Sequence, residues 1–78
     1  NVYPNPVSGI LRVEVNNPKS KTLTAEAFDV AGKVFLPAMQ IVNSNIFEIN
    51  CKDWPNGIYN LRMTEGSNVH NMKVVVIH

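Results

Sequence analysis

Residues 57–77, GIYNLRMTEGSNVHNMKVVVI, predict the clearest structural element of the chain, a β-hairpin. Apolar side chains recur at every second position from Tyr59 to Met63, as in a strand with one buried face. The segment 65–68, Glu-Gly-Ser-Asn, then supplies the small and polar residues of a turn. A last strand is therefore expected from Val69 to Ile77.

The same alternation occurs earlier in the chain. Apolar side chains alternate with polar ones from Leu11 to Val15 and again from Thr22 to Ala27, which predicts two more strands with one solvent-facing side. Asp29 and Gly32 then mark a tight turn, after which Val34–Leu36 begins the returning strand of a second hairpin.

Pro37 separates this hairpin from the segments that follow. Proline cannot donate a ladder hydrogen bond, so Pro37 is expected to end its strand or to place it at the edge of a sheet. Extended segments continue around Met39–Ile41 and at Ile46–Ile49, and the run Trp54-Pro55-Asn56-Gly57 predicts a turn before the last hairpin. No stretch keeps apolar residues at helical spacing, so no helix beyond a single turn is expected.

These segments predict an all-β fold, a small immunoglobulin-like antiparallel β-sandwich of about seven strands. The single cysteine, Cys51, cannot form the disulfide that joins the two sheets of antibody domains, so the prediction concerns architecture alone. The length of 78 residues fits one small domain, 1–78. Since the sequence opens without an initiator methionine or a leader, we expect this domain to be a fragment of a longer protein.

Composition excludes several kinds of partner. Seven lysines and arginines against six aspartates and glutamates give a net charge of +1, far from the basic surface that nucleic acid or an anionic membrane attracts. The longest apolar run, Val74–Ile77, is much too short for a transmembrane segment. The sequence therefore predicts neither nucleic-acid binding nor a membrane span.

No pattern in the sequence predicts an enzyme, a cofactor or a metal site. The two histidines, His70 and His78, lie in or after the last strand, and no serine is framed by a nucleophile-elbow motif. One cysteine and two histidines lack zinc-ligand spacing, and neither a calcium loop nor a phosphate-binding glycine loop is present.

Two further residues have both a functional and a structural interpretation. Cys51 is either an exposed thiol for an intermolecular bridge or a small buried apolar residue, and we favour the latter. Trp54 is either a platform for stacking sugars or a cap over one end of the core, and we favour the cap. The other aromatic residues do not line up on one face in any strand assignment; they are Tyr3, Phe28, Phe35, Phe47 and Tyr59.

Four motifs in order resemble the C-terminal sorting domain of proteins exported by the type IX (Por) secretion system of Bacteroidota. The first is Tyr3-Pro4-Asn5-Pro6 with the nearby Gly9. The second is the strand and turn around Asp29, Gly32 and Lys33, and the third is Gly57 with Tyr59. The fourth is the basic residue and valines of Lys73-Val74-Val75-Val76. Trp54 stands where the family usually has leucine, and the chain ends at His78 rather than on a lysine or arginine.

The resemblance implies a non-catalytic secretion signal. In that family the domain follows an attached cargo protein that has reached the periplasm, is read by the outer-membrane translocon, and is commonly removed by a sortase-like peptidase. The cargo then stays on the cell surface or is released. Our alternative hypothesis is a carbohydrate-binding or adhesion module of a secreted enzyme, which requires an exposed Trp54.

For the sorting signal we expect recognition through the edge of a sheet. The segment Val74–Ile77 has high strand propensity, and an edge strand can pair with a strand of a receptor. Lys73 is expected to act as a charge that limits non-specific pairing of this strand, and the rigid Pro4-Asn5-Pro6 segment to fix how the chain enters the domain.

Overall fold

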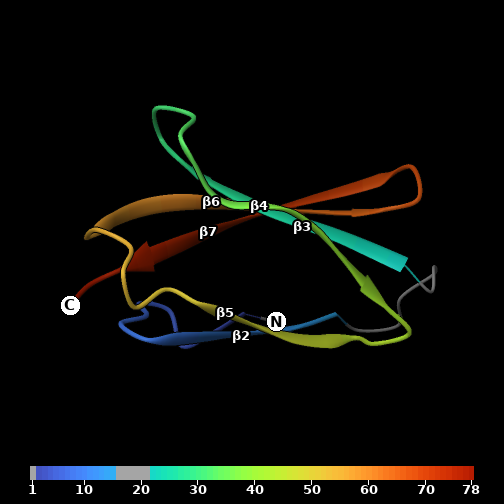
Figure 1. The fold of residues 1–78 in the computed structure, drawn as a ribbon, viewed down its shortest axis with the longest axis horizontal. Coiled ribbons are helices and arrows are strands. Elements are labelled where there is room, and N and C mark those ends of the chain that lie inside the picture. The colour runs from blue at the N-terminus through green and yellow to red at the C-terminus, as the bar shows by residue number, and fades with distance from the viewer. Residues whose placement is uncertain (1, 16–21) are drawn as a thin grey trace.

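Seven antiparallel strands form two layers in the computed structural model, which describes residues 2–15 and 22–78 (Figure 1). Within those residues no helix occurs. The strands are β1 (Val2–Tyr3), β2 (Ile10–Glu14), β3 (Thr22–Asp29), β4 (Val34–Val42), β5 (Ile46–Asn50), β6 (Gly57–Glu65) and β7 (Asn68–Val76).

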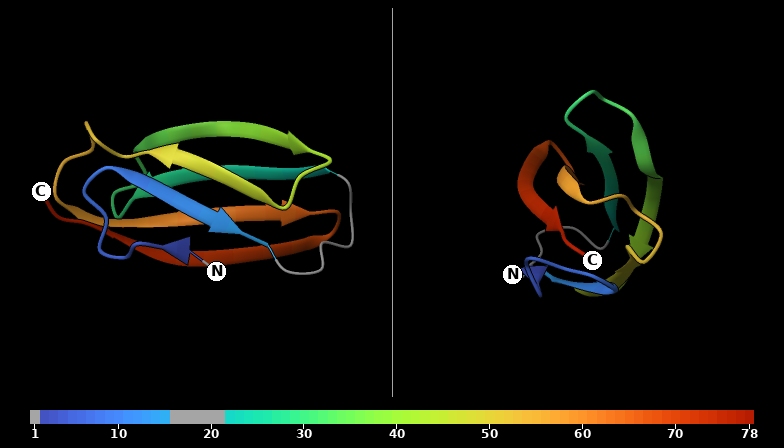
Figure 2. Two further views of the ribbon diagram at one scale, coloured as in Figure 1. Left: turned by 90° about the horizontal axis from the view of Figure 1, so that it is seen from below. Right: turned by 90° about the vertical axis from the view of Figure 1, so that its left-hand side faces the viewer.

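The strands pair as in an immunoglobulin-like sandwich. One sheet has the order β1-β2-β5 and the other β4-β3-β6-β7, and Figure 2 shows the two sheets facing each other. The second and fifth strands are thus neighbours in one sheet, and the third, sixth and seventh in the other, as strands B–E and C–F–G are in immunoglobulin domains. The predicted fold class is confirmed.

Side chains that alternate along the strands build the core between the sheets. The buried positions of β3 are Leu23, Ala25 and Ala27, and those of β6 include Tyr59, Leu61 and Met63, as the period of two predicts. Leu11 and Val13 of β2 cover them from the opposite sheet. Each fully buried valine or leucine contributes about 1.5–3 kcal/mol to folding through the hydrophobic effect, so this core accounts for most of the favourable energy.

The last hairpin has the predicted position and a two-residue turn. Tyr59 pairs with Val74 and Glu65 with Asn68, so the turn consists of Gly66 and Ser67. Gly66 has φ of +60°, the left-handed conformation that the first central position of a tight hairpin turn requires. The hairpin places β7 at one edge of the four-stranded sheet.

β4, the strand that contains Pro37, extends well beyond Val34–Leu36, the segment that the sequence predicts as its start. β4 continues to Val42 and forms the other edge of the four-stranded sheet, where Pro37 needs no ladder partner on its outer side. The pairing of β3 with β4 shifts register between Ala25 and Ala27 and again between Ala27 and Phe28. Such bulges bend an edge strand and make it a poor template for pairing with another chain.

Candidate recognition site

The first motif lies against the last strand. The side-chain amide of Asn5 donates from Nδ2 to the carbonyl of Lys73 at 3.0 Å, and its Oδ1 accepts from the amide of Val75 at 2.9 Å. Pro4 and Pro6 on either side are exposed, and both peptide bonds that precede them are cis. Figure 2 shows this N-terminal segment passing along the C-terminal half of β7.

Val7 extends the contact toward the end of the chain. Its amide donates to the carbonyl of Val75 at 2.9 Å, and its carbonyl accepts from the amide of Ile77 at 3.0 Å, while its side chain is fully buried. We call Asn5–Val7 the N-terminal strap. The strap occupies the outward backbone groups of β7 from the Lys73 carbonyl to the Ile77 amide.

The strap overturns the expected role of Val74–Ile77 as a free edge. Besides the covered backbone, the side chains of Val74 and Val76 are buried in the core, so they help to hold the two sheets together. The aliphatic run of the fourth motif therefore stabilises the fold, and a receptor strand cannot pair with it while the strap is in place.

The other residues of the first motif also make structural contacts. The Tyr3 hydroxyl donates to Glu14, and this hydrogen bond raises the pKa of the Tyr3 phenol. The carbonyl of Gly9 accepts from the amide of Cys51 at 2.8 Å, which ties the start of β2 to the end of β5.

The second motif is a turn held by one carboxylate. Asp29 Oδ1 accepts from the amides of Ala31 at 2.9 Å and Lys33 at 2.8 Å, while the Asp29 amide donates to the Lys33 carbonyl at 2.9 Å. Gly32 has φ of +88°, which a side chain at Cβ would oppose. Lys33 Nζ lies 5.2 Å from the centre of the Phe35 ring. Each residue of this motif thus contributes to the β3–β4 connection.

The third motif builds an aromatic cluster at one end of the sandwich. The ring of Tyr59 lies 5.0 Å from that of Phe35 and 5.0 Å from that of Trp54, and its hydroxyl donates to the Pro55 carbonyl at 2.5 Å. Gly57 opens β6, and a Cβ there would come within 3.9 Å of Tyr59, an ordinary contact. The structure thus brings Phe35 and Tyr59, two of the five aromatic residues that the sequence does not align on one face, together with Trp54.

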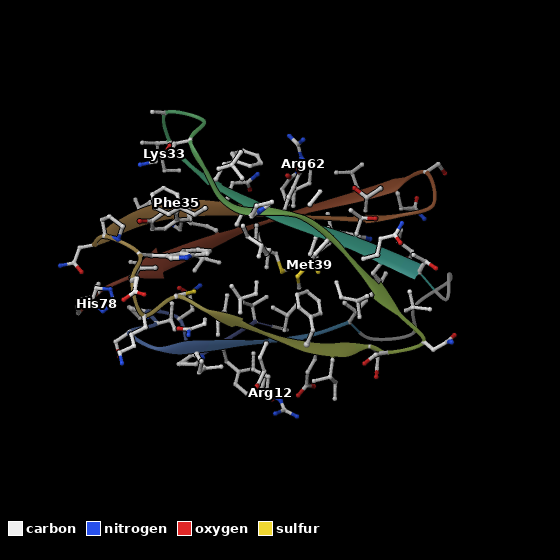
Figure 3. All side chains as sticks on the ribbon, in the orientation of Figure 1. Arg12, Lys33, Phe35, Met39, Arg62 and His78 are labelled. Atoms are coloured by element: carbon white, nitrogen blue, oxygen red, sulfur yellow. The ribbon has the colours of Figure 1, made fainter. Side chains whose placement is uncertain are left out.

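Burial of Trp54 decides between its two interpretations. Only 8% of Trp54 is exposed, which confirms the cap over the core and is incompatible with a sugar-stacking platform. His78 adds to this end, because its Nε2 lies 2.6 Å from the Trp54 carbonyl and its amide donates to Asn56 Oδ1 at 2.9 Å. Figure 3 shows Lys33, Phe35 and His78 at the same end of the molecule.

A groove of about 200 Å³ lies where three of the motifs meet. Its lining comes from the turn after β3, from β6 and from β7, and consists of Asp29, Val30, Ile58, Tyr59, Asn60, Asn71 and Lys73. Ile58 and Asn60 belong to the face of β6 opposite to the buried Tyr59 and Leu61, so the groove opens on the outer face of the four-stranded sheet. Arg62, two residues beyond Asn60 on the same face, projects away from the core in Figure 3.

Metal-ligating and nucleophilic side chains are the remaining reactive groups of the described residues. Within residues 2–15 and 22–78, no three His, Cys, Asp or Glu side chains lie close enough to hold a metal ion. Cys51 is fully buried, as favoured, and burial raises the pKa of its thiol to about 11. No helix in the described part of the chain is long and apolar enough to cross a membrane.

Sequence reasoning did not identify the contact between the first motif and the last. The sequence places Asn5, whose side-chain amide makes this contact, only in a rigid entry segment, and nothing local to Lys73 or Val75 indicates a partner about seventy residues away. The available signal is the composition of the motif, because the two prolines have no N–H to donate and the side-chain amide of the asparagine between them supplies the donors that they lack.

Comparison with known proteins identifies one family. The family model described as "Secretion system C-terminal sorting domain" matches residues 1–77, nearly the whole chain. No curated protein matches the sequence.

Proposed function

Because the chain belongs to the family of secretion system C-terminal sorting domains, we propose that it directs an attached cargo protein across the outer membrane through the type IX translocon. The family match over residues 1–77 is the observation that carries this proposal. A C-terminal sorting domain marks a secreted protein, which passes through the periplasm to the cell surface or the exterior.

The finer steps follow the family resemblance. The cargo precedes residue 1, the domain is recognised at the outer membrane, and a sortase-like peptidase removes it afterwards. In this scheme the whole of residues 1–78 is one module of a longer protein. Its role is to be bound by the secretion machinery, without catalysing a reaction itself.

The arrangement of the motifs supports recognition of a folded domain rather than of a linear peptide. The strap residue Asn5 bonds to β7, and Asp29, Tyr59 and Lys73 come from three separate segments yet border one groove. These residues are neighbours only after folding. The secretion machinery therefore has a three-dimensional surface to read.

A secretion assay tests the proposal. Residues 1–78 are fused behind a periplasm-directed fluorescent reporter and expressed in a Bacteroidota host with and without a working type IX translocon. We expect the reporter outside the outer membrane only when the translocon works. Intact reporter retained in the periplasm of both hosts would overturn the proposal.

The assay needs a control for folding. Leu61 is fully buried at the centre of the core, and Leu61→Ala is expected to remove about 2–5 kcal/mol of stability. If the machinery reads the folded domain, the L61A fusion stays in the periplasm of the competent host. Export of an unfolded L61A fusion at the wild-type level would show that a linear segment is read instead.

A further inference from the structure

Lys73 gives the groove a positively charged group that forms no ion pair with a carboxylate of the described residues. Among the described basic side chains, Arg12 pairs with Glu14 and Glu48, Arg62 pairs with Glu26, and Lys33 lies over Phe35. The ammonium groups of Lys52 and Lys73 form no ion pair with any described carboxylate. Of these two, only Lys73 borders the groove.

The only carboxylate in the lining is already engaged. Asp29 Oδ1 accepts from the amides of Ala31 and Lys33, so this side chain is held in its own turn. The separation between Asp29 and Lys73 exceeds ion-pair distance. An acidic group of a ligand can therefore approach Lys73 without displacing an internal partner.

Two asparagines beside Lys73 offer both hydrogen-bond donors and hydrogen-bond acceptors. Asn60 Nδ2 donates to Asn71 Oδ1 at 3.0 Å, which fixes the two amides relative to each other. The Asn60 Oδ1 acceptor and the Asn71 Nδ2 donors have no partner among the described residues. A peptide unit carries one N–H donor and one C=O acceptor, which is the set that these amides complement.

Exposed apolar side chains complete the lining. Val30 is 86% exposed and Ile58 is 49% exposed, although both are large aliphatic residues in a domain with a well-formed core. Burying these side chains under a ligand removes apolar surface from water, which favours binding. The groove thus combines a cation, peptide-like hydrogen-bonding groups and an apolar contact.

We propose that this groove binds an extended peptide segment of the secretion machinery that carries an acidic residue next to an apolar one. The carboxylate pairs with Lys73, the apolar side chain packs on Ile58 and Val30, and the peptide backbone bonds to Asn60 and Asn71. This proposal rests on the proposed function, because it names the chemistry by which the sorting signal is read.

Direct binding is tested with a defined probe. The 78-residue chain is titrated with the capped peptide Asp-Val-Asp-Val, with Lys-Val-Lys-Val as control, while amide chemical shifts are followed. We expect shifts concentrated at Lys73, Asn71, Asn60 and Ile58 with the acidic peptide alone, and binding about tenfold weaker in Lys73→Glu. Equal responses to both peptides, or shifts outside the groove, would overturn the proposal.

Secretion of reporter fusions separates this inference from the proposed function. Lys73→Glu is compared with Lys52→Glu, which makes the same charge change at an exposed lysine outside the groove, and with Lys73→Arg, which keeps the charge. Thermal unfolding confirms that each variant folds. We expect at least a fivefold loss of export for K73E, with K52E and K73R near the wild type.

The outcomes are distinct. If the wild-type fusion is exported and K73E is exported equally, the groove is not the site that is read, while the proposed function stands. If the wild-type fusion is not exported through the translocon, the proposed function fails, and the peptide titration alone decides whether the groove binds an acidic segment. Loss of export in K73E but not in K52E supports the groove.

Discussion

The amide of Val75 donates to Oδ1 of Asn5 at 2.9 Å, across seventy residues of sequence. Together with the bond from Asn5 Nδ2 to the Lys73 carbonyl, this gives β7 the two hydrogen bonds that a residue of a neighbouring strand would make. One side chain thus substitutes for a strand at the edge of the sheet.

Removing the side chain of Asn5 should open this edge. Each of the two exposed hydrogen bonds contributes about 0.5–1.5 kcal/mol, so Asn5→Ala is expected to lose about 1–3 kcal/mol of unfolding free energy. Hydrogen exchange should show faster exchange of the Val75 amide, while the Ile77 amide, bonded to Val7, stays protected. Asn5→Asp keeps the acceptor for Val75 and loses the donor to Lys73, so an equal increase in Val75 exchange in both variants would contradict the assignment.

The turn of the last hairpin should depend on glycine at one position. Gly66 has φ of +60°, so Gly66→Ala forces an L-residue into the left-handed region at a cost of about 1–2 kcal/mol. Gly9→Ala is the matched control, because Gly9 has no positive φ and a Cβ there meets no atom within 4 Å. Chemical denaturation of both variants measures the difference, and equal stability of G66A and G9A would show that the turn tolerates a side chain.

Cys51 should be inert at neutral pH. Burial raises the pKa of the Cys51 thiol from the ordinary value of 9.0 to about 11. Little reactive thiolate is therefore present at pH 8, and labelling by a thiol reagent should be slow until the protein unfolds. As the pH rises, the Cys51 thiol loses its proton at a lower pH in the unfolded chain than in the folded protein. The free energy of unfolding attributable to Cys51 is therefore constant below pH 9 and falls between pH 9 and about 11. Cys51→Ala should lack this component, and rapid labelling of the folded wild type would refute the burial.

The hydroxyl of Tyr59 should stabilise the turn before β6. Tyr59→Phe keeps the ring in contact with Phe35 and Trp54 but removes the bond to the Pro55 carbonyl, with an expected loss of about 0.5–1.5 kcal/mol in thermal unfolding. The fluorescence of Trp54 should remain that of a buried indole in both proteins. Glycan addition should leave it unchanged, whereas quenching by glycans would contradict the buried cap.

Local patterns predict most of the fold because they are set by neighbouring residues. The alternation from Tyr59 to Met63 and the turn at Gly66 fix the last hairpin through burial and backbone conformation alone. The extent of β4 depends instead on its pairing with β3. This pairing shifts register near Pro37 and so accommodates the proline. No residue next to Pro37 in the sequence indicates the shift.

The candidate site is harder to predict than the strands, because it depends on contacts between residues that are far apart in the sequence. Asp29, Tyr59 and Lys73 are recognisable one by one as motif residues, but their common groove results from the order β3-β6-β7, a non-local property. Strand propensity alone predicts an exposed edge for the valines of Val74–Ile77. Propensity does not distinguish an edge from a buried strand, and the strap, together with the core position of Val74 and Val76, decides that question.

The strap also sets an order in which the domain can assemble during synthesis. Its partners, from Lys73 to Ile77, leave the ribosome about seventy residues after Asn5 and Val7, so the first motif cannot be docked until residues 73–77 have been synthesised. A nonsense mutation or premature stop before Lys73 leaves the outward groups of the strap without their β-strand. The strap thus docks only in products that extend through Ile77.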